Sequence, residues 1–80
     1  MKVVRGEERR MRTFVGMLPD GGIALRETMR PYVCLVAVYD EERKRWVAIR
    51  WSSKFLGGLR WVREHRKRSR QAVLVIVYEV

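Results

Sequence analysis

The sequence predicts an α+β fold, in which a mainly antiparallel sheet of four or five strands carries one main helix on one face. Residues 32–40 and 72–80 are rich in β-branched residues and apolar on both sides, as strands inside a sheet are. Between them, residues 53–68 carry apolar side chains at helical spacing. Because a strand follows this helix directly, we expect a crossover that leaves the last strand parallel to one of the others.

A β-hairpin is predicted over residues 13–27. Its turn is Pro19-Asp20-Gly21-Gly22, in which proline presets φ and the two glycines adopt positive φ at little steric cost. Apolar and polar residues alternate only loosely along the two strands, so the alternation does not assign which face of this hairpin is buried.

A second hairpin is predicted from strands at residues 32–40 and 46–52, joined by a charged loop over residues 41–45. Successive side chains of a strand point to opposite faces, so the alternation assigns the residues of the second strand to two sides. One side takes Val47, Ile49 and Trp51, and the other takes Trp46, Ala48 and Arg50.

The main helix is expected to begin after a cap at Ser52 or Ser53 and to run to about Arg68. Gly57 and Gly58 lie inside it, although each glycine costs about 1 kcal/mol relative to alanine. Either the helix packs very closely on the sheet there, which we favour, or it begins only after the two glycines. The predicted apolar stripe consists of Phe55, Leu59 and Val62, with Leu56 at its flank.

The chain length corresponds to one small domain over residues 1–80, with a mobile or partly ordered N-terminal arm at 1–12 and a short strand at 2–4. Hydrophobic residues make up 48% of the chain, which predicts a packed core. One helix shields only one sheet face. The N-terminal segment, a second copy or a partner must cover the other, and we favour a homodimer.

A reducing, cytoplasmic environment is expected from the cysteine content and the lengths of the apolar runs. Cys34 is the single cysteine, so it cannot form an internal disulfide, and its apolar surroundings predict a buried, inert thiol. The longest apolar runs are 7 residues, whereas a membrane span needs about 20. The first residues show no apolar stretch of signal-peptide length.

The charge balance favours a polyanionic partner. The chain has 18 Lys and Arg against 9 Asp and Glu, a formal charge of +9, and the resulting self-repulsion would be relieved by a bound polyanion. Arginine outnumbers lysine 14 to 4, which suits phosphate recognition, although codon bias gives the same ratio. The alternative is a surface tuned for solubility or high temperature.

The helix carries the clearest candidate site. Four cations recur at steps of three, four and three residues, which places them within an arc of about 80° where they could follow a phosphate backbone. Glu64 is the only acid among them; the alternative is an ordinary solvated helix face. The four are Arg60, Arg63, Lys67 and Arg70.

The end of the helix is predicted to project beyond the sheet, because Arg66 falls in the middle of the apolar stripe. This projection would leave a basic knob available to a partner. The knob consists of Arg66, Lys67, Arg68 and Arg70.

Additional candidate contacts lie outside this row. Aromatic rings among cations can stack on bases, although Trp61 and Trp46 could equally pack at a core margin or a dimer interface. The loop cations could touch phosphates or belong to an ordinary hairpin tip, partly cancelled by Glu41 and Glu42. The additional candidate cations are Arg50, Lys54, Arg43, Lys44 and Arg45.

The function predicted from these features is non-enzymatic binding of nucleic acid, DNA or RNA, through its phosphate backbone. One alternative is a protein-interaction module or inhibitor that docks on an acidic partner surface. A third is a small RNA-cleaving enzyme centred on His65, the only histidine. One cysteine and one histidine cannot build a closed zinc site, and neither glycine pair fits a nucleotide-binding loop, so we expect no metal and no cofactor.

Overall fold

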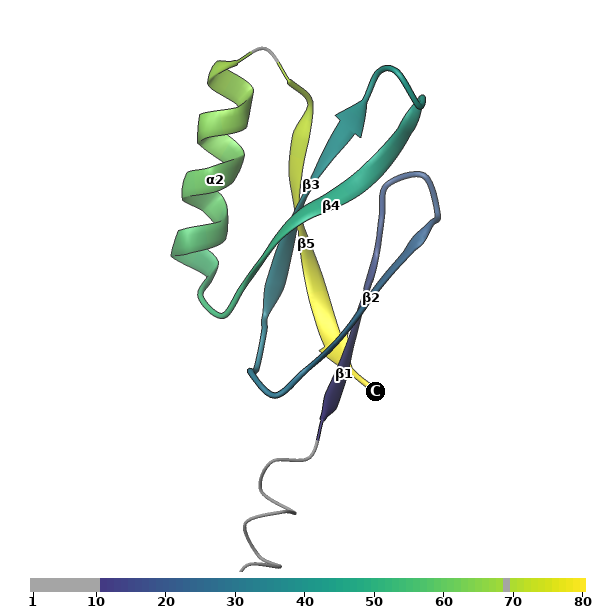
Figure 1. The fold of residues 1–80 in the computed structure, drawn as a ribbon. Helices are drawn as coiled ribbons and strands as arrows, with labels where there is room; N and C mark the ends of the chain where they lie inside the picture. Colours follow the sequence, from purple (N-terminus) through teal and green to yellow (C-terminus); the bar gives the residue numbers. More distant parts are fainter. Residues whose placement is uncertain (1–10, 69) are drawn as a thin grey trace, which may run out of the picture.

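The structure, a computed structural model, describes residues 11–68 and 70–80. The short strand predicted at residues 2–4, and residues 1–10 of the predicted arm, lie outside this part. Five strands and one helix follow in order (Figure 1). They are β1 (Arg12–Met17), β2 (Ile23–Thr28), β3 (Cys34–Asp40), β4 (Arg45–Ser52), α2 (Phe55–Lys67) and β5 (Ala72–Glu79).

The strands form one sheet in the order β2-β1-β5-β3-β4, and every neighbouring pair is antiparallel. The predicted α+β class, with one helix on the sheet and a strand after it, is therefore confirmed. The two strands that are apolar on both sides, β3 and β5, lie inside the sheet. The crossover prediction needs correction: β5 runs in the same direction as β4, but β3 lies between them, so β5 has no parallel partner.

One face of the sheet is covered by α2, which packs on β3, β4 and β5. Val62 of the helix is buried against Val36, Val38 and Ala72. The helix approaches most closely at Gly58, where a Cβ atom would lie 2.6 Å from Leu74 Cδ1 and 2.8 Å from Cys34 Sγ. The close packing expected at the glycines is thus confirmed, and Cys34 is fully buried beneath it.

The predicted apolar stripe of the helix is only partly right. Gly58 and Val62 are the buried residues of α2, whereas Phe55 and Leu59 are about half exposed and Leu56 is 80% exposed. The reason is the close approach at Gly58, which turns the helix so that residues 58 and 62 face the sheet. A glycine carries no hydrophobic signal, so the apolar spacing pointed to the neighbouring face.

The helix also begins later than predicted. Its N-cap residue is Lys54, without a side-chain cap, rather than Ser52 or Ser53. The Ser52 hydroxyl accepts a hydrogen bond from the Lys54 backbone N–H (3.1 Å) and donates one to the Lys54 carbonyl (2.7 Å). Ser52 therefore stabilises the turn that precedes the helix.

The opposite, concave face of the sheet is buried by the curvature of the sheet itself. Phe14, Ala24, Leu35, Ala37 and Val77 form a core cluster that draws on β1, β2, β3 and β5. Aromatic side chains pack against it from Tyr32, Trp46 and Trp51. The inference that a second copy must cover this face assumed an open sheet, and one chain largely buries it.

A β-bulge in β4 overturns the predicted assignment of its side chains. Ala37 pairs with Ala48 and Val36 with Arg50, which leaves Ile49 without a counterpart. The extra residue reverses the alternation. Arg50 therefore shares the helix-covered face with Val47, while Trp51 joins Trp46 and Ala48 on the concave face.

Within residues 11–68 and 70–80, the structure contains no helix that is both long and apolar enough to span a bilayer.

Candidate nucleic-acid interface

Arg50 and Trp61 form the central contact of the candidate interface. The guanidinium carbon of Arg50 lies 3.8 Å from the centroid of the Trp61 ring, within the range of a cation–π interaction. The bulge at Ile49 makes this contact possible, because it directs Arg50 towards the helix. Both residues were predicted for the site, but their contact was not.

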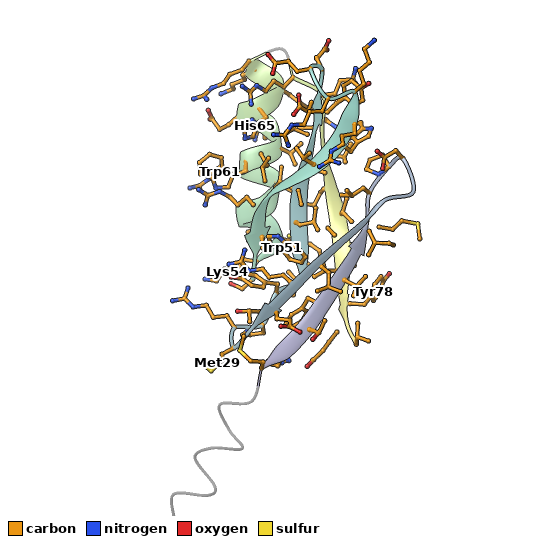
Figure 2. The ribbon with its side chains drawn as sticks, turned by 45° about the vertical axis from the view of Figure 1, so that its right-hand side comes forward. Met29, Trp51, Lys54, Trp61, His65 and Tyr78 are labelled. Atoms are coloured by element: carbon orange, nitrogen blue, oxygen red, sulfur yellow. The ribbon has the colours of Figure 1, made fainter. Side chains whose placement is uncertain are left out.

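His65 lies one turn after Trp61 on α2, with ring centroids 6.2 Å apart (Figure 2). Burial lowers the pKa of His65, and the nearby charges of Arg70, Arg68 and Arg50 lower it further. The imidazole is therefore neutral at pH 7. Its buried Nδ1 atom has no hydrogen-bond partner among the described residues.

Arg68 and Arg70 lie beside His65 because the chain turns back where α2 ends. The backbone N–H groups of both residues donate to the His65 carbonyl, at 3.0 and 3.2 Å. Arg70 therefore lies beyond the helix and does not continue the predicted row of four cations. It joins Arg50 and Arg68 near the imidazole instead. We call this group the His65 cluster: Arg50, Trp61, His65, Arg68 and Arg70.

The remaining cations of the predicted row lie on the exposed surface of α2. At 100° per residue, Arg60 and Lys67 fall nearly opposite the buried Val62, and Arg63 falls on the flank away from Trp61. Lys67 makes a long ion pair of 3.9 Å with Glu64. These three cations are open to solvent: Arg60 and Lys67 lie on the outer surface of α2, and Arg63 lies on the flank opposite the His65 cluster.

One of the four cations predicted as a basic knob at the helix end is hydrogen-bonded to the sheet. Arg66 Nε donates a hydrogen bond of 3.0 Å to the carbonyl of Ala72, the first residue of β5. This contact anchors the helix end to the sheet, which explains why an arginine occurs where the apolar stripe would continue.

The loop cations lie at the tip of the β3–β4 hairpin, at the same end of the molecule as the end of α2 (Figure 1). Arg43 pairs with Asp40 at 3.7 Å, and Lys44 adopts a positive φ of 56°. Arg45 lies near Asp20, on the other side of the hairpin from the helix. The loop thus carries mixed charge and contributes less than α2 to a cationic surface.

Two predicted site residues lie apart from the cluster. Trp46 packs into the concave core, with its ring centroid 5.7 Å from that of Tyr39, so it matches the core-margin alternative. Lys54 lies at the start of α2, about 20 Å along the helix axis from Lys67. Figure 2 shows Lys54 and Trp61 at different levels of the helix.

The electrostatic balance of this surface is strongly positive. Residues 43–70 contain 11 Lys and Arg and one carboxylate, Glu64. In the described part of the chain, only Arg43 and Lys67 among the predicted site cations form salt bridges. Among residues 11–68 and 70–80, no three His, Cys, Asp or Glu side chains group together as metal ligands would.

Searches of known protein families, curated proteins and solved structures find no match to this chain. The functional proposal therefore depends on the geometry and charge described above.

Proposed function

We propose that this protein binds nucleic acid, without catalysing a reaction on it, through α2 and the His65 cluster. The observation that carries the proposal is the Arg50–Trp61 contact, with Arg68 and Arg70 gathered beside the same flank of the helix. In the described residues these three arginines form no salt bridge, so their guanidinium groups are free to bind phosphate oxygens.

Phosphates are expected to be the main ligands, with Arg60, Arg63 and Lys67 extending the contact along the helix. Each phosphate contact releases condensed counterions, so affinity should fall steeply with salt. Trp61 is 37% exposed and offers part of its ring for stacking on a base. Recognition of the backbone, rather than of sequence, follows from this combination.

The surroundings of His65 support binding rather than cleavage. A general base needs a group that orients it, and Nδ1 has no hydrogen-bond partner within the described residues. The neighbouring Glu64 carboxylate lies 3.9 Å from the Lys67 ammonium. Undiminished RNA cleavage by a His65→Ala variant would exclude His65 from any such activity.

The experiment that tests the proposal is a fluorescence-anisotropy titration with labelled single-stranded DNA, duplex DNA and RNA of equal length. The salt concentration is varied between about 50 and 200 mM, a range over which six to ten phosphate contacts cost about 10³–10⁵ in affinity. We expect a linear fall of log K with log salt for at least one probe. Equal affinity at both salt concentrations would remove the proposal.

A cytoplasmic homodimer also remains a prediction. The observation that favours self-association is an apolar row over β2, β1 and the end of β5, which lies on the same side of the sheet as α2 but beyond the part that the helix covers. In this row Leu25 pairs with Val15, and Val15 with Tyr78, whose exposed fraction is 70%. Sedimentation equilibrium tests it: a Leu25→Glu variant should be monomeric where the wild type is dimeric, and a monomeric wild type contradicts it.

A further inference from the structure

The two edge strands of the sheet face each other across a groove. β2 and β4 lie at opposite ends of the strand order, yet the curvature of the sheet brings residues of both to line one cavity of about 500 Å³. Its walls include Ile23, Ala24 and Leu25 from β2, and Trp46, Val47 and Ala48 from β4. The sheet therefore resembles a barrel with one strand missing.

The free edge of β2 presents unused backbone groups to this groove. Leu18 N–H donates to the Gly22 carbonyl at 2.7 Å, so Gly22 and every second residue after it direct their backbone groups towards β1. Strand alternation then directs the N–H and C=O groups of Ile23, Leu25 and Glu27 the other way. No strand among residues 11–68 and 70–80 pairs with this edge.

On the free edge of β4, one backbone N–H already donates a hydrogen bond to a side chain in place of a neighbouring strand. Trp46 N–H donates at 3.2 Å to Asp20 Oδ2, which extends from the β1–β2 turn across the end of the groove. Hydrogen bonds from Gly22 and then Trp46 hold the pKa of Asp20 below its usual value, so this carboxylate is ionised. Ala48 lies two residues further along the same edge, and its backbone groups face the groove without a partner strand in the described chain.

The side chains of the groove leave room for an added strand. Ala24 and Ala48 are the small residues of its two walls, and Trp51 contributes an aromatic surface. Ile23 and Leu25 are about 60% exposed on the outer side. An inserted strand would therefore meet apolar surface on both of its faces, as an internal strand does.

Charged side chains lie at one end of the groove and near the other. Arg45 lines one end, where the ionised Asp20 carboxylate offsets its charge. At the other end, Arg26 lies 5.4 Å from the centroid of the Tyr32 ring, which is 6.0 Å from that of Trp51. A segment with a carboxylate at the Arg26 end would match this charge pattern.

We propose that the groove between β2 and β4 binds an extended segment of a partner protein, apolar along the groove and acidic at the Arg26 end, which pairs with both edges and closes the barrel. A nucleic acid lacks the backbone N–H and C=O ladder that these edges require. Within residues 11–68 and 70–80, a second copy offers no spare edge strand, because β1, β3 and β5 each have two partners and β2 and β4 form the groove itself.

The test uses a capped seven-residue peptide with glutamate at one end, for the Arg26 end of the groove, and valine and threonine in the other positions, titrated into ¹⁵N-labelled protein. We expect saturable shifts of the Ile23, Leu25 and Ala48 amides and of the Trp51 indole. A matched peptide with alternate residues N-methylated should bind at least tenfold more weakly, because it lacks the backbone donors of a strand. Equal binding of both peptides, or no saturable shift at these amides, overturns the proposal.

A pair of protein variants provides the complementary test. Leu25→Pro removes one N–H from an edge strand, where proline is tolerated, whereas Leu25→Thr keeps that donor and the strand propensity. The proline variant should lose at least tenfold in peptide affinity, and the threonine variant much less. Equal losses overturn the proposal; if the proline variant does not fold, the N-methylated peptide decides alone.

Other occupants of the groove give distinct outcomes. Shifts of the Ala48 amide and the Trp51 indole that depend on protein concentration would assign the groove to a second copy; Leu25 is left out of this comparison because it also lies in the row of the predicted homodimer. Shifts of the groove amides caused by an oligonucleotide would assign the groove to nucleic acid. Either result overturns the proposal. Salt-dependent nucleic-acid binding should be equal in the wild type and both Leu25 variants, so the two proposals can fail independently.

Discussion

The Arg50 guanidinium lies against the ring of Trp61, 3.8 Å from its centroid, and joins the bulged strand β4 to the exposed helix α2. The contact fixes the position of a long, mobile side chain that would otherwise sample many rotamers in solvent. It also holds a cation close to His65, Arg68 and Arg70, where like charges would otherwise favour separation. An arginine fixed in this way can bind phosphate with a smaller loss of conformational entropy.

The contact should be measurable as an energetic coupling. Arg50→Gln and Trp61→Leu, made singly and together, form a double-mutant cycle in chemical denaturation. We expect a coupling of about 0.5–1 kcal/mol, because an exposed cation–π interaction contributes that much. Additive effects of the two substitutions would show that the contact contributes nothing to stability.

Gly58 and Gly57 provide a matched pair for the helix–sheet contact. Gly58→Ala should lower the free energy of unfolding by about 1–3 kcal/mol, because its Cβ would overlap Leu74 and the buried Cys34. Gly57→Ala meets only Ser52 Oγ at 3.2 Å, so we expect a change of less than about 1 kcal/mol, with improved helix propensity opposing mild crowding. Urea denaturation of both variants checks this ranking. A Gly58→Ala variant as stable as the wild type would contradict it.

His65 should make stability depend on pH in a defined direction. Its folded pKa lies below 6.5, chiefly because of burial and then because of Arg70, Arg68 and Arg50. The unfolded chain therefore takes up a proton first as the pH falls, so the free energy of unfolding decreases as the pH drops through 6.5 and levels off below the folded pKa.

The measurement is the urea midpoint at several pH values above the carboxylate range, for the wild type and for His65→Gln. The variant should lose the part of the pH dependence that begins near 6.5 and extends down to the folded pKa of His65. A wild-type protein that becomes more stable over that interval as the pH falls would contradict the direction of the shift.

Much of the fold follows from local sequence. The turn at residues 19–22 and the apolar segments that became β3 and β5 carry strong signals, and both apolar strands took internal positions. The curvature of the sheet is different, because it depends on β1 pairing with β5 from the far end of the chain. The residue pattern within one hairpin does not show that two hairpins, distant in the sequence, form a curved sheet around one core.

The candidate site was predicted in composition but not in geometry. The helix cations were identified from their spacing, whereas one unpaired residue, Ile49, changed the direction of every later side chain in β4. Simple alternation therefore placed Arg50 beside Trp46, and the structure places it against Trp61. The sequence suggested only a catalytic role for His65, since its arginine neighbours come from β4 and from beyond the helix end.

The most direct test of nucleic-acid binding through α2 compares two double variants with the same loss of charge. Arg60→Gln/Arg63→Gln alters the helix, and Arg26→Gln/Arg30→Gln alters exposed arginines of β2 and the segment after it. In anisotropy titrations across a salt series, the helix variant should reduce the slope of log K against log salt by about 1.8 units on duplex DNA, or about 1.4 on single strands, while the control keeps the wild-type slope. Equal reductions in both variants would show that net charge, rather than this surface, accounts for the binding.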